Sequence, residues 1–163
     1  MKTQKRRRKE HKTDYMNRLR LLKSEKPRIV FRKTNKYIIG QYVISKQAQD
    51  KIEIGLNSKK LIKYGWLKEF KGSLKSIPAT YLTGYLIGKR IIKKKLETPI
   101  IDLGMHRTLH KTKIYAFLKG LTDAGVKIKC KEENFPSEER IRGEHMKNKI
   151  SFEEIKFKID EEN

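Results

Sequence analysis

Positive charge constrains this chain more than any other feature of its sequence. Lys and Arg number 41 in 163 residues against 19 Asp and Glu, which gives a formal net charge of +22 at pH 7. A charge of this size opposes a compact state through self-repulsion, so it is usually balanced by a polyanionic partner. The sequence therefore favours a protein that binds nucleic acid, built around a core drawn from a hydrophobic fraction of only 36%.

The charge is unevenly distributed along the chain. Residues 1–36 carry a net charge of +12, residues 37–130 carry +13, and residues 131–163 carry −3. Seven of the 11 arginines fall within the first 32 residues. Because the planar guanidinium can bind phosphate through two parallel hydrogen bonds, we expect the first 36 residues to contact nucleic acid. The alternative interpretation of such a run is a solvated basic tail or a targeting signal.

The pattern divides the chain into three parts. These are a basic arm with a short helix (1–26), an α/β core that binds the nucleic acid (27–130), and a C-terminal extension with short helices (131–163). The single cysteine, Cys130, cannot form an intramolecular disulfide, which indicates an intracellular protein. The longest stretch without charge, Ser76 to Gly88, has 13 residues, against the ~20 apolar residues of a membrane span. We therefore expect no membrane partner.

The arm and the first strands have clear local signals. Residues 2–12 contain no apolar side chain and are expected to be disordered without a partner. Thr13 or Asp14 can cap a helix that runs to Ser24. Its predicted buried face consists of Tyr15, Leu19 and Leu22.

Three strands are predicted next. Residues 28–33 and 37–45 are rich in β-branched and aromatic side chains and predict a hairpin, with Asn35 left-handed in its turn. Residues 51–56 alternate strictly, which predicts a third strand with one buried face, formed by Ile52, Ile54 and Leu56.

The second half of the core reads as helices and strands in alternation. Helices are predicted at 58–64, from Pro78 onward and at 113–123, and strands at 98–103 and 126–130. The final strand–helix–strand order implies a parallel pair with a right-handed crossover. Gly84 and Gly88 would let their helix approach the sheet closely. The fold class is therefore α/β, a mixed sheet with helices packed on one face, followed by tail helices that begin near Ser137 and Ser151.

The sequence contains no motif of catalytic chemistry. It has no nucleophile elbow, phosphate-binding loop or dinucleotide fingerprint, so we expect neither an enzyme nor a cofactor. His106 and His110 have the i, i+4 spacing that can bind zinc on a helix, but no third ligand stands near them in the sequence. We therefore predict no metal site.

The remaining candidate residues form a set of RNA contacts. In the arm and its helix they are Arg6, Arg7, Arg8, Lys9, Arg18 and Arg20. The hairpin interleaves cations with polar and aromatic side chains that could contact bases or sugars: Arg28, Arg32, Lys33, Asn35, Lys36, Tyr37 and Tyr42. Each aromatic residue could equally belong to the core. A further group surrounds the start of the helix at 113, where free amides attract phosphate: Arg107, His110 and Lys113. The last group is Arg140 and Arg142, which could instead form local ion pairs.

Several segments together resemble one known family. Residues 18–22 (RLRLL) and 26–36 (KPRIVFRKTNK), 102–107 (DLGMHR), 116–126 (AFLKGLTDAGV) and 140–145 (RIRGEH) occur in the order of the universal L-eighteen family of large-subunit ribosomal proteins, in its archaeal form. The family commonly has a Thr-x-Gly turn after the position of Arg107, whereas residues 108–111 here contain no glycine.

The resemblance implies a structural role. Members of this family bind 5S rRNA through the N-terminal region and the sheet, and attach it to the large-subunit rRNA in the central protuberance beside universal protein L-five. It implies a mixed α/β fold, a cytoplasmic location on the ribosome and no self-oligomer. The alternative from composition alone is a general nucleic-acid chaperone or a DNA-packaging protein, which would not need these ordered segments.

Overall fold

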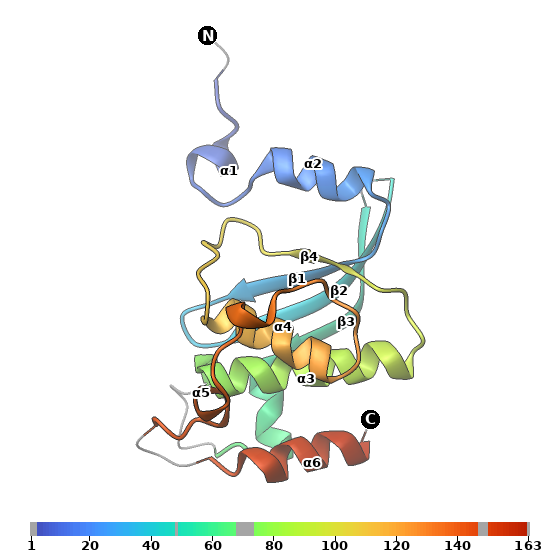
Figure 1. Cartoon of the computed structure of the whole chain (residues 1–163). Coiled ribbons are helices and arrows are strands. Elements are labelled where there is room, and N and C mark those ends of the chain that lie inside the picture. Colours follow the sequence, from blue (N-terminus) through green and yellow to red (C-terminus); the bar gives the residue numbers. More distant parts are fainter. Residues whose placement is uncertain (1–2, 48, 68–73, 147–149, 163) are drawn as a thin grey trace.

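A four-stranded mixed sheet lies between the N-terminal helices and two central helices in the computed structural model (Figure 1), which describes residues 3–47, 49–67, 74–146 and 150–162. The N-terminal part contains α1 (Arg6–Lys9), α2 (Tyr15–Lys23), β1 (Arg28–Lys33), β2 (Ile38–Lys46), β3 (Gln49–Asn57) and the 3-10 helix η1 (Ser58–Tyr64). The rest contains α3 (Ile77–Lys93), β4 (Ile100–Asp102), α4 (Lys113–Asp123), the 3-10 helix η3 (Glu132–Asn134), α5 (Glu138–Arg142) and α6 (Phe152–Glu162).

The sheet confirms the predicted α/β class and mixed strand pairing. Its order is β3-β2-β1-β4, with β1–β2 and β2–β3 antiparallel and β1–β4 parallel. Thr34 stabilises the predicted hairpin turn: its hydroxyl donates to the Tyr37 carbonyl at 2.8 Å and accepts from the Tyr37 amide at 2.9 Å. Asn35 does not adopt the left-handed conformation that we expected, because this side-chain bridge closes the turn without it.

The predicted last strand at 126–130 is wrong. This segment forms no strand, and the parallel partner of β1 is β4. The alternation that suggested a strand has another cause. Val126 is buried and Ile128 is half-buried against the same hydrophobic core, while Lys127 and Lys129 are exposed on an irregular segment.

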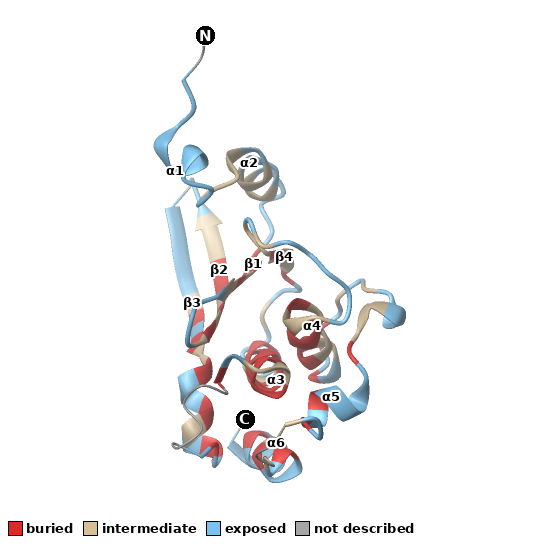
Figure 2. Cartoon of the chain, turned by 90° about the vertical axis from the view of Figure 1, so that its left-hand side faces the viewer, coloured by how far each residue is buried: buried red, intermediate tan, exposed pale blue. Residues whose placement is uncertain are grey.

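Helices α3 and α4 form the centre of the core. Alternate residues of β1 point toward them, and the Phe31 ring packs on Phe117 of α4 with centroids 5.0 Å apart. Helix α3 is buried from Pro78 to Gly88, because it is covered by the sheet, by α4 and by the C-terminal helices (Figure 2). A Cβ on Gly84 would collide with the Phe117 carbonyl, so this glycine serves the approach of α3 to α4 and not, as expected, to the sheet.

The N-terminal helices lie on the opposite face of the sheet. Asp14 caps α2 by accepting from the amides of Met16 and Asn17 at 3.0 and 3.2 Å, which confirms the predicted helix start. The predicted buried face is wrong at Leu19, which is 54% exposed. Helix α2 has no buried residue, and its Arg18 binds Asp50 of β3 at 3.0 Å. Ile52 is also exposed, near the end of β3 that extends past the central helices.

The C-terminal extension packs on the core. Ser137 precedes α5 and Ser151 precedes α6, as predicted. Ile141, Phe152 and Ile155 join the hydrophobic cluster built by the sheet and α3. The described part of residues 131–163 therefore shares one core with the preceding segment.

Candidate nucleic-acid interface

A pocket of about 530 Å³ opens at the start of α4, where four segments that are distant in sequence meet. These are the end of β1, the start of α3 at Ile77, the continuous segment 106–114 that leads from a loop into the first turn of α4, and α5. Its cationic lining residues are Lys33, Arg107, Lys111, Lys113 and Arg140, and no Asp or Glu lines it in the described part of the chain. We call it the basic pocket. It brings together five charged or ionisable residues predicted from the sequence, counting His110 with Lys33, Arg107, Lys113 and Arg140.

The N-terminus of α4 adds to this positive potential. Thr112 holds the N-cap position without a side-chain cap, because its hydroxyl donates to the Leu109 carbonyl at 2.7 Å. The first turn has no acidic residue, and Lys113 stands there instead. Helix N-termini favour anions and disfavour cations. An anionic group in the pocket would therefore interact favourably with both the helix end and the lysine.

The crowding of cations is visible in the pKa of Lys113. Burial lowers this pKa, and the nearby charges of Lys33 and Lys75 lower it further. The pKa of His106 is also lowered, first by burial and then by Arg32 and Lys33. Because like charges disfavour protonation, a phosphate bound among them would stabilise the charged form of Lys113.

Histidines and an unusual backbone shape the pocket wall. The neutral His106 ring accepts a hydrogen bond at Nε2 from the Lys33 amide, 3.2 Å away and 73 residues earlier in the sequence. The His110 ring stacks on Tyr115 with centroids 5.6 Å apart. Lys111 adopts a left-handed φ of 58°. It belongs to residues 108–111, the segment in which the family that this sequence resembles commonly has a glycine. Nothing in the sequence signalled the role of His106, because it depends on which residue the fold places opposite it.

The arm presents a second group of cations. Arg6 to Lys9 are all exposed, and the single helical turn that they form has no buried residue. We expected residues 2–12 to be disordered without a partner, whereas residues 6–9 form this turn. The Lys5 ammonium lies over the Tyr15 ring, 4.6 Å from its centroid, and Arg8 is 3.8 Å from Asp14. The arm therefore lies beside α2, whose Arg20 is exposed.

Two of the predicted contacts lie inside the protein. Arg28 is 1% exposed and its guanidinium binds Asp50, Asp102 and Ser45. Tyr42 is also 1% exposed, and its hydroxyl donates to the Glu97 carbonyl at 2.9 Å. We therefore assign both to the core in place of the predicted RNA contact. Alternation along the strands could not decide this, because both faces of β1 and β2 are covered.

The other predicted residues are more accessible. Asn35 and Lys36 are exposed at the hairpin turn beside the half-buried Tyr37. Arg32 is half-buried and binds Asp102, and Arg18 binds Asp50. Arg142 is exposed and its Nε lies 3.8 Å from Glu153, in line with the alternative of a local ion pair.

The described residues contain no group of three His, Cys, Asp or Glu side chains that could hold a metal ion, and His106 and His110 lie in a loop and not on a helix. None of the helices in the described ranges has the length and apolar character of a bilayer span.

An α/β fold with exposed cations on an N-terminal arm, and with a basic pocket that no described carboxylate lines, is typical of a protein that binds a polyanion. Comparison with known proteins identifies the polyanion class. Residues 1–99 match the family described as ribosomal large subunit proteins 60S L5 and 50S L18. The chain belongs to this family, and it is therefore a large-subunit ribosomal protein that binds rRNA and serves translation.

The relatives named large ribosomal subunit protein uL18 are archaeal. The protein of Korarchaeum cryptofilum is 46% identical over 157 residues, which cover 96% of this chain and 75% of the relative. That of Methanospirillum hungatei is 42% identical over 86% of this chain and 78% of its own length. That of Aeropyrum pernix is 41% identical over 86% of this chain and 64% of its own length. The predicted family, in its archaeal form, is confirmed.

Proposed function

We propose that this chain binds 5S rRNA and attaches it to the large-subunit rRNA in the central protuberance, beside universal protein L-five. The observation that carries the proposal is the basic pocket, in which five cations from three segments distant in sequence meet, and which no carboxylate of the described residues lines. Such an arrangement is costly for a protein alone, because like charges repel at close range. It becomes favourable when phosphates lie among the cations. We take the identity of the RNA, 5S rRNA, from what the resemblance to the family implies.

The role is structural and needs only binding and geometry. Cations of the arm and the pocket neutralise phosphates of the RNA backbone, and this sequence-independent contribution supplies much of the affinity. The His110 ring, which stacks on Tyr115 and is exposed, offers an aromatic surface for a base that leaves the RNA helix. The arm and the pocket together would hold one folded RNA against the body of the subunit.

The proposal predicts nanomolar binding of purified 5S rRNA at physiological salt. A roughly hundredfold excess of tRNA should leave the complex intact, because tRNA offers phosphates without the matching shape. Filter binding or fluorescence anisotropy with labelled 5S rRNA measures the affinity and the competition by tRNA. Equal affinity for 5S rRNA, tRNA and duplex DNA would contradict the proposal and favour a general nucleic-acid chaperone.

A single substitution tests whether the basic pocket takes part. Affinity falls as salt rises, and Lys113→Gln should make this dependence shallower, by about 0.8 in the slope of log affinity against log salt. That change corresponds to roughly fivefold weaker binding at 0.15 M salt. The matched control is Lys127→Gln, which removes the same charge beyond the far end of α4, roughly 20 Å along the helix axis. The control should leave the slope unchanged. Equal effects of the two substitutions would exclude a specific role for the pocket.

A further inference from the structure

A chain of alternating charges crosses the sheet surface beneath α2. Arg18 of α2 binds Asp50 at 3.0 Å, and Asp50 binds Arg28 of β1 at 2.7 Å. Arg28 in turn binds Asp102 of β4 at 3.3 Å, and Asp102 binds Arg32 at 3.1 Å. This series of ion pairs therefore links a helix and three strands through five side chains. We call it the ionic chain.

Burial makes the middle of the ionic chain rigid. The Arg28 side chain is 1% exposed and that of Asp102 is 9% exposed. Buried charges remain ionised only when partners and hydrogen bonds surround them, so each member restricts the position of the next. Ser45 adds to this restriction, since its hydroxyl accepts from Arg28 at 2.8 Å and donates to Asp50 at 2.6 Å.

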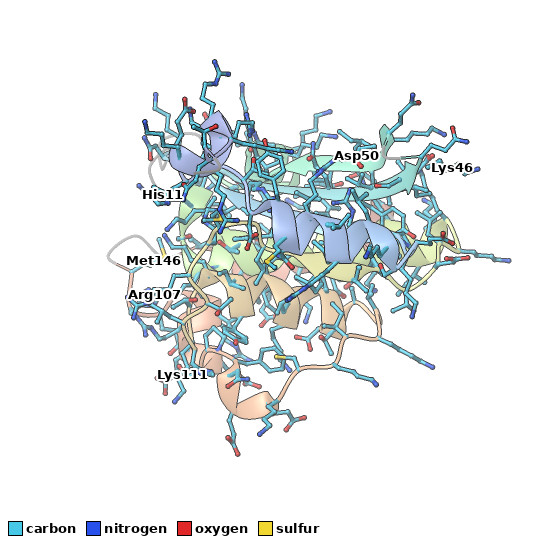
Figure 3. All side chains as sticks on the ribbon, turned by 90° about the horizontal axis from the view of Figure 1, so that it is seen from above. His11, Lys46, Asp50, Arg107, Lys111 and Met146 are labelled. Atoms are coloured by element: carbon cyan, nitrogen blue, oxygen red, sulfur yellow. The ribbon has the colours of Figure 1, made fainter. Side chains whose placement is uncertain are left out.

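The two ends of the ionic chain reach the two RNA-facing regions. At one end, Arg18 belongs to α2, against which the arm lies. At the other end, Asp102 accepts from the Gly104 amide at 2.9 Å, and the Arg32 guanidinium lies so close to Gly104 that an added Cβ would be 2.9 Å from Cζ. Gly104 opens the loop that carries Arg107 and Lys111 to the basic pocket. Seen from above, these two residues lie at one side of the molecule and Asp50 lies toward the other, with α2 extending between them (Figure 3).

We propose that Asp50, Arg28 and Asp102 are positioning residues that hold α2 and the 104–112 loop in one fixed arrangement before RNA binds. Binding to a preorganised surface avoids the entropy cost of ordering it at that moment. The ionic chain thus contributes to affinity although its central residues touch no RNA. The affinity part of this proposal rests on the proposed function, whereas the positioning itself can be measured on the protein without RNA.

The first test uses the free protein and two arginines of the same helix. Arg18→Gln removes the α2 end of the ionic chain and leaves the buried pairs of Arg28 intact. Arg20→Gln removes the same charge from an exposed residue that has no ion pair among the described residues. We expect amide hydrogen exchange within residues 15–23 to rise about tenfold in R18Q and less than about twofold in R20Q. Equal exchange in the two variants would overturn the positioning role.

The second test measures RNA affinity, and its sign is informative. Asp50→Asn makes the protein one charge more positive, so electrostatics alone predicts tighter RNA binding. Positioning predicts the reverse, a loss of about five- to tenfold, because α2 is released. The control Glu53→Gln adds the same charge on the same strand, where Glu53 forms an ion pair with Lys51 outside the ionic chain. This control should bind RNA as tightly as the wild type or slightly tighter.

The outcomes separate the two proposals. If D50N binds RNA as tightly as E53Q does, the positioning role is overturned while RNA binding stands. If the wild type does not bind 5S rRNA but R18Q still exchanges faster than R20Q in α2, the proposed function fails and the positioning of α2 stands. Circular dichroism of D50N shows whether the variant is folded, and R18Q decides the question if it is not.

Discussion

Replacement of Arg6, Arg7, Arg8 and Lys9 by glutamine is expected to weaken 5S rRNA binding roughly 300-fold at 0.15 M salt. These four side chains are exposed, and no core contact depends on them. If each neutralises one phosphate, the slope of log affinity against log salt falls by about 3. Salt titrations of the wild type and the variant would then converge near 1 M salt, which is where the electrostatic contribution vanishes in this treatment.

A matched variant separates specific arm contacts from net charge. Replacing Lys59, Lys60, Lys63 and Lys127 by glutamine also removes four exposed positive charges, on segments that lie away from the arm. This control should retain most of the wild-type slope. If the salt dependence of RNA affinity becomes shallower by the same amount in both variants, affinity follows total charge and the arm has no special role. Thermal unfolding of both should match the wild type, since neither set of residues is buried.

Gly120→Ala should lower the free energy of unfolding by about 3 kcal/mol, or abolish folding. Gly120 of α4 lies against the backbone of α3: an added Cβ would collide with the Tyr81 carbonyl and lie 2.8 Å from the Tyr85 nitrogen. Backbone atoms cannot rotate away as a side chain can, so the helices would have to separate. Alanine favours a helix by only about 1 kcal/mol over glycine, which is too little to compensate.

The comparison for this prediction is Gly55→Ala on β3. There the added Cβ would meet only the Ile52 side chain, at an ordinary 3.5 Å. We expect a change within about 0.5 kcal/mol in urea or guanidinium unfolding. Wild-type stability of Gly120→Ala would show that α3 and α4 do not cross as closely as the structure has them.

The sequence predicted the elements whose signals are local. The helix at 113–123 was predicted with its observed bounds, because its apolar residues repeat with helical spacing and a left-handed Gly125 ends it. The hairpin was found because two β-rich runs flank a short polar turn. The prediction of a strand at 126–130 failed because Val126 and Ile128 face the hydrophobic core while Lys127 and Lys129 face solvent. An irregular segment can thus show the same alternation of apolar and polar residues as a strand.

The candidate interface was predictable only in its composition. The sequence showed where cations are, but not which of them have carboxylate partners. Arg28 and Arg32 are bound by Asp102, some 70 residues later, so an arginine-rich strand is partly internal. Lys33 and Arg140 line one pocket although 107 residues separate them. Such pairings arise from the register of β1 with β4 and from the docking of α5, which no local pattern encodes.

Cross-linking within assembled large subunits tests the central claim most directly. A photoreactive amino acid placed at Arg7 in the arm or at Lys111 in the basic pocket would label whatever lies against each region. The proposed function predicts that both positions cross-link to 5S rRNA, while the same group at Lys127 does not. Labelling of other rRNA or of proteins alone, with no 5S rRNA at either position, would contradict it.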